Sequence, residues 1–389
     1  MRDNNVTTLK SRIRFIHTSD WQLGMTRAFL SPEALSRFSQ ARIDAIATLG
    51  KLAKMHEAQF IVVAGDVFES NQLSRQTLMR AIDVLESLSV PIFLLPGNHD
   101  PLDASSIFST KEFRGVGEYI IVLRNMDPVS VPGLPGVEVV GAPWRTKHPN
   151  SDLCRELADS LDPANNTIRV AVAHGQVDTL SPDPFRPEVI NLTNAEQAIQ
   201  DNKFHYLALG DRHSVTEVGS TGRVRYSGAP VATAFDEDDP NKALLVELQL
   251  DGNSRVEPLE VGAWSFIAKE RAMNGAEDLA AFEKWLNEIP NKGRTAIKVG
   301  FQGSINLATA AALDEIMDSK AELFASLRQR ERTTDLAIVP DELDQDSVSL
   351  SGYARDTWNE LHEMARQDDR VAQDALRLFY RLSAQGGTE

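Results

Sequence analysis

Five short polar clusters in this sequence carry side chains that bind divalent metal ions. They hold carboxylates, imidazoles and one amide, and each follows a short apolar run. The clusters are Asp20-Trp21-Gln22, Gly65-Asp66, Gly97-Asn98-His99-Asp100, His174-Gly175 and Gly210-Asp211-Arg212-His213. Each cluster alone is weak evidence, since a Gly-Asp pair after a strand is most often a turn. Together they offer enough oxygen and nitrogen ligands for two divalent ions, which predicts a hydrolytic site.

The apolar runs before these clusters are the elements that must position them. Each is rich in Ile, Val, Leu or Phe and predicts a buried strand. The runs are Ile13–His17, Phe60–Ala64, Pro91–Leu95, Arg169–Ala173 and Phe204–Leu209. Helical patterns lie between them: Ser31-Pro32 opens a helix to about Met55, and a second helix is expected from about Arg75 to Leu88. This alternation predicts an α/β fold whose ligands meet at the carboxyl edge of the strands.

The remaining histidines are expected to have no part in the site. His17 lies inside the first strand, so its side chain is expected to point into the core. The other four, His56, His148, His205 and His362, are expected at the surface or in loops.

The second half of the chain changes in pattern. Strands without helices follow Arg223, at Ala243–Leu250 and Val256–Val261, and are expected to belong to the second sheet of a sandwich. A small α/β unit is then predicted: strands at Trp264–Ala268, Thr295–Phe301 and Thr334–Val339, with helices at Glu277–Glu288 and Asn306–Arg328. The expected domains are therefore 1–262, 263–342 and a helical tail, 343–389.

The helical tail has an amphipathic stripe. From Tyr353 the pattern is helical, and apolar residues recur at helical spacing: Val371, Ala375, Leu378, Phe379 and Leu382. Such a stripe packs on its own domain or docks a partner chain, and the sequence leaves both open.

Composition limits the class of protein. The 389 residues contain one cysteine, Cys154, which excludes an intrachain disulfide and fits a reducing compartment. The segment Met1–Ser11 is polar and no apolar run approaches the ~18 residues of a membrane span, so a cytoplasmic protein is expected. The net charge of −16 opposes long-range attraction to nucleic acid. A DNA-acting protein of this charge needs a local basic lining, for which the loop arginines are Arg27, Arg145, Arg186 and Arg223, or a partner.

The order of the motifs resembles that of calcineurin-like metallophosphoesterases, whose signature is Asp-x-His, Gly-Asp, Gly-Asn-His-Asp, His and Gly-His-x-His. The segments Ile16-His17-Thr18-Ser19-Asp20-Trp21-Gln22-Leu23-Gly24 and Ala64-Gly65-Asp66-Val67-Phe68-Glu69-Ser70-Asn71 are similar to the SbcD-type DNA repair exonuclease branch of that family. The resemblance implies a four-layer α/β/β/α sandwich, here with a small α/β capping domain and C-terminal helices.

The resemblance also implies a set of metal ligands. Asp20 and His213 would bind the first ion, Asn98 and His174 the second, and Asp66 would bridge them. Two ions held in this way activate a shared water, which attacks phosphorus in line.

A general acid is implied next to these ligands. His99 would contact the phosphate and protonate the leaving oxygen, and Asp100 is expected to hold the His99 ring cationic and oriented. Arg212 lies between two of the implied ligands, and its side chain would reach either a substrate phosphate or a structural carboxylate.

Two positions depart from the family pattern. Gln22 stands where the family has a ligand histidine, and Asp211 stands where the first histidine of the last motif is expected. Both exchanges replace a nitrogen ligand with oxygen, so the first ion should be held less tightly. Oxygen-rich sites favour Mn²⁺ or Mg²⁺ over Zn²⁺, so two divalent ions with Mn²⁺ as the activator are expected, while Mg²⁺, Fe or Zn²⁺ stay open.

The leading hypothesis is therefore a metal-dependent DNA exonuclease of DNA repair. Its C-terminal helices would dock an SbcC-like ATPase. One alternative is a phosphodiesterase or phosphatase for a small substrate such as a cyclic nucleotide, and another is a non-catalytic scaffold. The sequence leaves open whether cleavage is exo- or endonucleolytic and whether the chain forms a homodimer.

Overall fold

The computed structural model describes residues 12–338, 352–367 and 369–385. The chain forms two compact units. One contains the described residues up to Arg27 together with Leu35–Trp264, and the other contains Ala28–Ala34 and the described residues from Ser265 onward. The polar segment Met1–Ser11 lies outside the described residues. Of the helices that the structure describes, none has the length and apolar character needed to cross a membrane.

Two six-stranded sheets form the first unit. In spatial order the first sheet contains β12 (Ser254–Glu260), β11 (Lys242–Gln249), β1 (Arg12–Thr18), β2 (Phe60–Val63), β3 (Ile92–Leu94) and β4 (Ile120–Val122). The second contains β5 (Val129–Ser130), β6 (Val137–Gly141), β7 (Ile168–His174), β8 (Tyr206–Gly210), β10 (Val224–Ser227) and β9 (Val215–Val218). Strands β1 to β4 are parallel, as are β6, β7, β8 and β10, so the carboxyl ends of each set lie at one edge.

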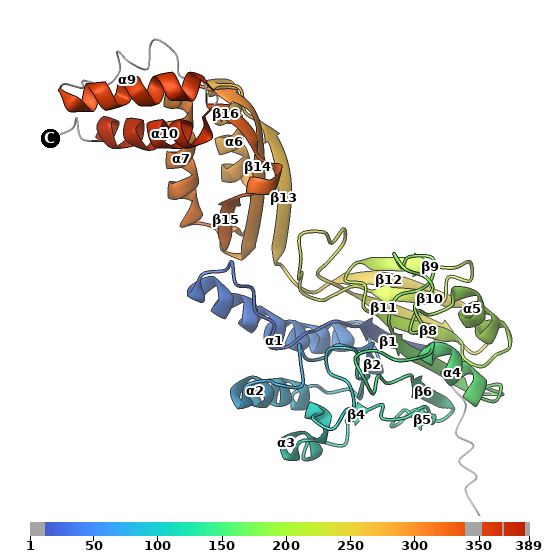
Figure 1. The fold of residues 1–389 in the computed structure, drawn as a ribbon. Coiled ribbons are helices and arrows are strands. Elements are labelled where there is room, and N and C mark those ends of the chain that lie inside the picture. Colours follow the sequence, from blue (N-terminus) through green and yellow to red (C-terminus); the bar gives the residue numbers. More distant parts are fainter. Residues whose placement is uncertain (1–11, 339–351, 368, 386–389) are drawn as a thin grey trace, which may run out of the picture. The chain divides into compact units, whose positions relative to one another are not determined.

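Helices cover the outer face of each sheet, which gives four layers (Figure 1). Helices α1 (Pro32–Met55), α2 (Arg75–Glu86) and α3 (Lys111–Arg114), with the 3-10 turn η1 (Ile107–Ser109), pack on the first sheet. Helices α4 (Leu153–Ser160) and α5 (Leu192–Gln200) pack on the second. Between the sheets lies an apolar core in which the rings of Phe15 and Phe60 stack with centroids 5.0 Å apart. The predicted four-layer sandwich is confirmed.

One part of the strand assignment was wrong. Strands β11 and β12 extend the first sheet instead of belonging to the second, because β11 pairs antiparallel with β1 from Arg12 to His17. The Nε atom of Arg14 lies 2.9 Å from Glu247 Oε2 across this pair. The alternate residues Leu244, Val246 and Leu248 of β11 enter the core between the sheets. Alternation predicts a strand but does not identify its neighbour, since pairing is decided by long-range register.

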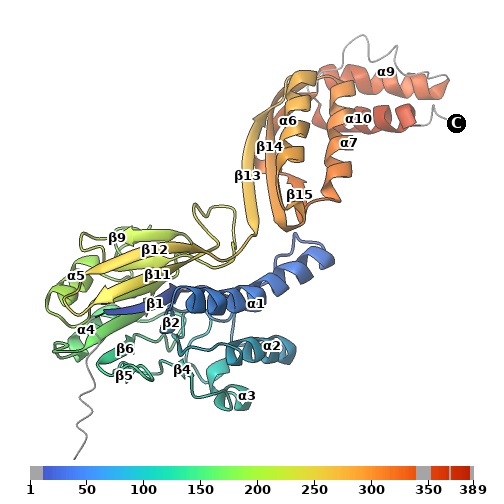
Figure 2. The same cartoon turned by 180° about the vertical axis from the view of Figure 1, so that it is seen from behind.

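The second unit has a parallel four-stranded sheet (Figure 2). Its strands are β13 (Ser265–Ala272), β14 (Thr295–Ile305), β15 (Ser326–Gln329) and β16 (Asp335–Ile338). Its helices are α6 (Ala276–Glu288), α7 (Leu307–Ala321), α9 (Tyr353–Arg366) and α10 (Arg370–Gln385), with 3-10 turns η2 (Lys292–Arg294) and η3 (Glu331–Thr333). The helix predicted to reach Arg328 ends instead at Ala321. The amide of Ala325 donates to Thr295 O, which starts strand β15 beside β14.

Helices α9 and α10 share the apolar core of this unit with β14 and α7. On α10 the buried residues are Ala372 and Leu376, whereas Val371 and Leu378 of the predicted stripe are 78% and 49% exposed. Phe379 of the stripe does pack against this core, so the packing face is rotated from the stripe but overlaps it. The side chain of Leu382 lies outside the described residues.

Three of the remaining histidines are buried. His17 lies in the core as predicted, where Nδ1 is 3.1 Å from the Tyr206 hydroxyl. His205 and His362 were expected at the surface or in loops. His205 lies in the loop before β8 but is buried, and its Nδ1 accepts a hydrogen bond from Arg169 N. The expectation is wrong for His362, which is buried on the core side of α9.

Candidate metal centre

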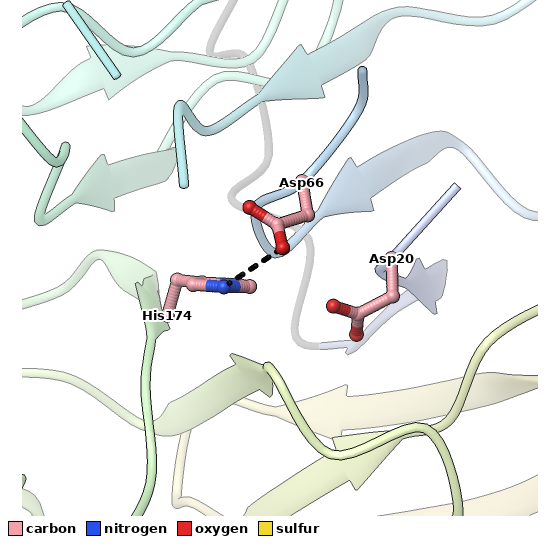
Figure 3. Close-up of side chains that lie close together, drawn as sticks. All are labelled: Asp20, Asp66 and His174. Carbon is pink, nitrogen blue, oxygen red and sulfur yellow. Dashed lines mark ion pairs between the residues drawn. The ribbon is translucent and has the colours of Figure 1, made fainter. Parts of the chain in front are cut away.

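Three of the sequence-predicted ligands, Asp20, Asp66 and His174, converge at the edge where the two sheets face each other (Figure 3). Asp20 follows β1, Asp66 follows β2, and His174 ends β7, so both sheets contribute. One ligand atom from each residue lies within 4.8 Å of the others. His174 Nε2 is 3.4 Å from Asp66 Oδ2, and all three side chains are buried. A buried cluster of two carboxylates and an imidazole is a suitable site for a cation.

The backbone around the cluster has unusual conformations. Asp20, Gln22, Asp66 and Asp211 all have positive φ, at 54°, 42°, 53° and 95°. Non-glycine residues rarely adopt such φ values, and they gather at functional sites when the surrounding structure holds them. Here the amide of Asp20 donates to Gly65 O and the amide of Gln22 donates to Asp66 O, so the two loops hold each other.

Glycine is required where the sheets approach closely. Gly65 has φ of +91°, and a Cβ at this position would lie 2.2 Å from His174 Nδ1. At Gly97 a Cβ would lie 2.2 Å from Asp66 Oδ1. The glycine that precedes Asp66, and the one that precedes Asn98, therefore allow β2, β3 and β7 to bring their ends together.

His174 is oriented through its Nδ1 atom. This nitrogen donates to the backbone oxygen of Ala64 at 2.8 Å, so the neutral ring presents the lone pair of Nε2 to the site. Nε2 lies 2.7 Å from Asn98 Oδ1 and 3.9 Å from Asp211 Oδ1. The Asn98 oxygen and the Nε2 lone pair are both acceptors, so a proton on the ring or a cation between them would satisfy this approach.

His213 is held in the same way. Its Nδ1 donates to Glu237 Oε1 at 3.0 Å and lies 2.6 Å from Thr233 Oγ1, so Nε2 is directed inward, 3.6 Å from Asp20 Oδ1. Glu237 also accepts from the amide of Thr233. The sequence reasoning missed Glu237 and Thr233, because they follow the last motif by a loop and belong to no pattern of spacing.

In this cluster, burial and neighbouring charges shift the pKa values of the side chains in opposite directions. Burial raises the pKa of Asp20, although His213 and His174 oppose the shift. Burial also acts to raise the pKa of Asp66, but His174 and His99 together outweigh burial and the pKa falls below its usual value. Burial would lower the pKa of His174, yet Asp66, Asp20 and Asp211 together raise it well above the ordinary histidine value. The pKa of His213 rises because its carboxylate neighbours outweigh burial. The cluster therefore attracts positive charge.

Two buried oxygen atoms lack a hydrogen-bond partner here. These are Gln22 Oε1 and Asp211 Oδ2, both at positions that depart from the family pattern. Buried oxygens are normally satisfied, so unpartnered ones beside a carboxylate cluster fit a cation as the missing partner. The amide of Asp211 donates to the Asp20 carboxylate, which ties the last motif to the first. The residues present thus suit a divalent ion with oxygen-rich ligands.

His99 lies beside the cluster and is half-exposed. Its Nε2 is 3.9 Å from Asp66 Oδ2, its amide donates to Asp66 Oδ1, and its Nδ1 lies 3.0 Å from Glu69 O. The expected pairing of His99 with Asp100 is wrong. The Asp100 carboxylate instead accepts from the amides of Phe68 and Gly97, which anchors the loop after β2 to the loop after β3. Burial and the charge of Asp66 raise the pKa of Asp100 to about 7, against the effect of those two donors.

Three arginines, Arg27, Arg186 and Arg212, have structural partners or line hollows next to the candidate centre. Arg27 donates to Thr233 O and Arg212 Nε donates to Thr216 Oγ1, so both have structural partners. Arg212 also lines a hollow of about 260 Å³ with Asp211, His213 and Glu237. Arg186 lines a second hollow of about 160 Å³ with Asn98 and Asp211. The candidate centre therefore opens onto two hollows that each have an arginine in the wall.

Comparison with known proteins agrees with this geometry. The model of the family described as calcineurin-like phosphoesterase matches residues 13–215, just over half of the 389 residues. The chain is similar to the SbcD component of the nuclease SbcCD of Escherichia coli K12, at 27% identity over 285 residues, 64% of this chain and 67% of the relative. It is also similar to the SbcD component of the same nuclease of Bacillus subtilis 168, at 25% identity over 311 residues, 71% of this chain and 76% of the relative.

Among solved structures, a dimetal phosphatase from Danio rerio aligns with 64% of this chain and 98% of its own, at 12% identity and a TM-score of 0.38. The family match covers the strands and loops that build the cluster. The chain belongs to the calcineurin-like phosphoesterase family.

Proposed function

We propose that this phosphoesterase is a metal-dependent DNA nuclease, an exonuclease of DNA repair that works with an ATPase partner. The observation that supports hydrolysis is the buried cluster of Asp20, Asp66 and His174. The Nδ1 atoms of His174 and His213 are hydrogen-bonded to Ala64 O and Glu237, which leaves both Nε2 atoms for the site. DNA as the substrate is supported by similarity to the SbcD components of SbcCD nucleases, at 25–27% identity. Residues 1–262 would be the nuclease domain and 263–342 a capping domain.

In this proposal the ligands form two groups around Asp66, which would be shared between them. Asp20, His213 and Gln22 would hold one ion, and Asn98, His174 and Asp211 would hold the other. Asp211 belongs with His174 because its Oδ1 is 3.9 Å from His174 Nε2. The sequence predicts weaker binding of the first ion from both Gln22 and Asp211. With Asp211 in the other group, only Gln22 would weaken the binding of that ion.

The catalytic step needs an activated water and a proton donor. Two divalent ions, when bound, polarise the attacking water and neutralise the phosphoryl oxygens, and the oxygen-rich ligands favour Mn²⁺. His99 is half-exposed beside Asp66, where its Nε2 can protonate the leaving oxygen of a phosphodiester. Glu69 O, at 3.0 Å from Nδ1, accepts a hydrogen bond from the other ring nitrogen and so holds the orientation of the His99 ring.

The helical tail is proposed to dock the ATPase partner. Val371 and Leu378 are exposed on α10, and Tyr353 is 84% exposed at the start of α9. These apolar side chains are accessible as contacts for a partner chain. The names of the relatives, which describe one component of a nuclease with more than one kind of chain, support the same assignment.

The test is cleavage of linear duplex DNA by protein that has been stripped with chelator and reloaded with Mn²⁺. Cleavage that depends on Mn²⁺ and falls 10²- to 10⁴-fold in His99→Ala is expected. Asp103→Asn, an exposed acidic residue in the same loop region, is the matched control and should cleave normally. Hydrolysis of bis(4-nitrophenyl) phosphate without DNA cleavage would favour a small substrate. Inactivity on both, with an SbcC-like ATPase added, would favour a scaffold.

A further inference from the structure

A third hollow of about 780 Å³ lies in the same unit as the candidate centre. We name it the side cavity; its wall includes Asn125, Met126, Arg145, Lys147, His148 and Leu153. The wall comes from the loop after β4, from the loop between β6 and α4, and from the first turn of α4. A volume of this size is within the range of cavities that hold small organic ligands.

The side cavity is linked to the candidate centre through shared wall residues. Lys147 and His148 line the side cavity, and they also line the hollow of about 160 Å³ that contains Asn98 and Asp211. A ligand whose reacting phosphate lies at Asn98 can therefore extend past Lys147 into the side cavity. Trp144, near the start of the loop between β6 and α4, donates from Nε1 to His174 O at 2.8 Å and so fixes this part of the loop relative to the centre.

The wall of the side cavity combines exposed cationic side chains with an apolar surface. Arg145, Lys147 and His148 are exposed, whereas Met126, Pro143 and Leu153 supply a less exposed apolar surface. The acidic residue in the wall is Glu156, and Ser151 Oγ donates to its Oε1. The whole chain has a net charge of −16, but this wall carries two permanent cations and one hydrogen-bonded carboxylate. The wall is therefore locally positive in an acidic protein.

Cations beside an apolar surface suit a nucleotide. Phosphate groups are bound by Lys and Arg, and the flat face of a base packs on apolar or aromatic surface with little dependence on sequence. A small phosphoester with no further groups would leave the apolar surface unused.

We propose that the side cavity binds the nucleotide next to the scissile phosphate, with its base against Met126 and Leu153 and its phosphate at Arg145 and Lys147. This inference rests on the proposed nuclease function and names how the strand leaves the centre. It also explains how an acidic protein grips DNA locally without attracting it from a distance.

The experiment measures binding of a fluorescein-labelled 12-nucleotide single strand by anisotropy, with Mn²⁺ present. Every protein carries His99→Ala to slow cleavage, and intact oligonucleotide is checked after each titration. Arg145→Ala/Lys147→Ala is compared with Lys51→Ala/Lys54→Ala, which removes two exposed lysines of α1. The cavity variant should bind at least tenfold more weakly, and its salt dependence should fall by about 1.4 in log–log slope for two lost phosphate contacts. The α1 control should match the parent protein.

Catalysis separates this inference from the proposed function. With His99 intact, the cavity variant should lose at least tenfold more kcat/KM on DNA than on bis(4-nitrophenyl) phosphate. If parent and cavity variant bind and cleave DNA alike, the side cavity has no such role and the nuclease assignment stands. If DNA is never cleaved but the cavity variant still binds the strand more weakly, the side cavity binds single-stranded DNA, whereas the nuclease assignment falls and the position next to a scissile phosphate falls with it. Equal weakening in the α1 control would mean that total charge decides, which overturns the inference.

Discussion

Glu237 Oε1 lies 3.0 Å from His213 Nδ1, and this contact orients the imidazole toward Asp20. The Glu237 side chain is 6% exposed, so its charge acts in a poorly solvated place. A carboxylate behind a histidine selects the tautomer with a free Nε2 and makes that nitrogen more basic. The contact thus joins the loop after β10 to the predicted ligand set.

Glu237→Gln should weaken metal binding about tenfold, because the ring loses its anionic partner. Titration calorimetry with Mn²⁺ on chelator-stripped protein measures the affinity directly. Asp238→Asn removes a charge from the adjacent exposed position and should bind Mn²⁺ like the unmodified chain. Equal affinities for Glu237→Gln and the unmodified chain would show that Glu237 does not tune His213.

Gln22 is predicted to be a weak oxygen ligand. Gln22→His should bind Zn²⁺ about tenfold more tightly relative to Mn²⁺, because imidazole nitrogen suits Zn²⁺ better than an amide oxygen does. Histidine also tolerates the left-handed backbone of this position, at φ of 42°. Competition titrations of the two metals give the ratio. Gln22→Ala should lose affinity for both metals, and unchanged affinity would remove Gln22 from the ligand set.

Metal removal should destabilise the first unit. The buried carboxylates of Asp20 and Asp66 repel each other, and a bound cation compensates that repulsion. At a concentration 100 times Kd, Mn²⁺ should add about 2.7 kcal/mol to the free energy of unfolding, a rise in Tm on the order of 5–10 °C. Calorimetry with and without chelator measures it. Asp66→Asn should abolish the Mn²⁺-dependent rise, and a persistent rise in that variant would place the ions elsewhere.

Buried His17 should make stability depend on pH. Burial lowers the pKa of His17 from 6.5 to about 3. Between these two pH values the unfolded chain binds a proton at His17 and the folded chain does not. The stabilisation is complete above pH 6.5 and is lost as pH falls toward the folded pKa, by up to about 1.4 kcal/mol per pH unit. Urea unfolding of the first unit between pH 6.5 and 5 measures the slope. His17→Gln should flatten that slope, and His56→Gln, directly after α1, is the matched control.

Much of the fold was predictable because local pattern dictates local structure. The runs at 13–17, 60–64, 91–95, 169–173 and 204–209 became β1, β2, β3, β7 and β8, and α1 begins at Pro32, directly after Ser31, as expected. Apolar runs of this length bury themselves as strands, and parallel strands release their polar ends at one edge. The candidate residues could be named from sequence for the same reason.

Tertiary structure alone decided what depends on contacts between distant segments. It placed β11 beside β1, buried His205 and His362, and rotated the packing face of α10 from the predicted stripe. It directed Asp100 to the amides of Phe68 and Gly97 and brought Glu237 to His213. A sequence reports which side chains can donate or accept, but their partners are chosen by the register of two sheets and by loops that meet only after folding.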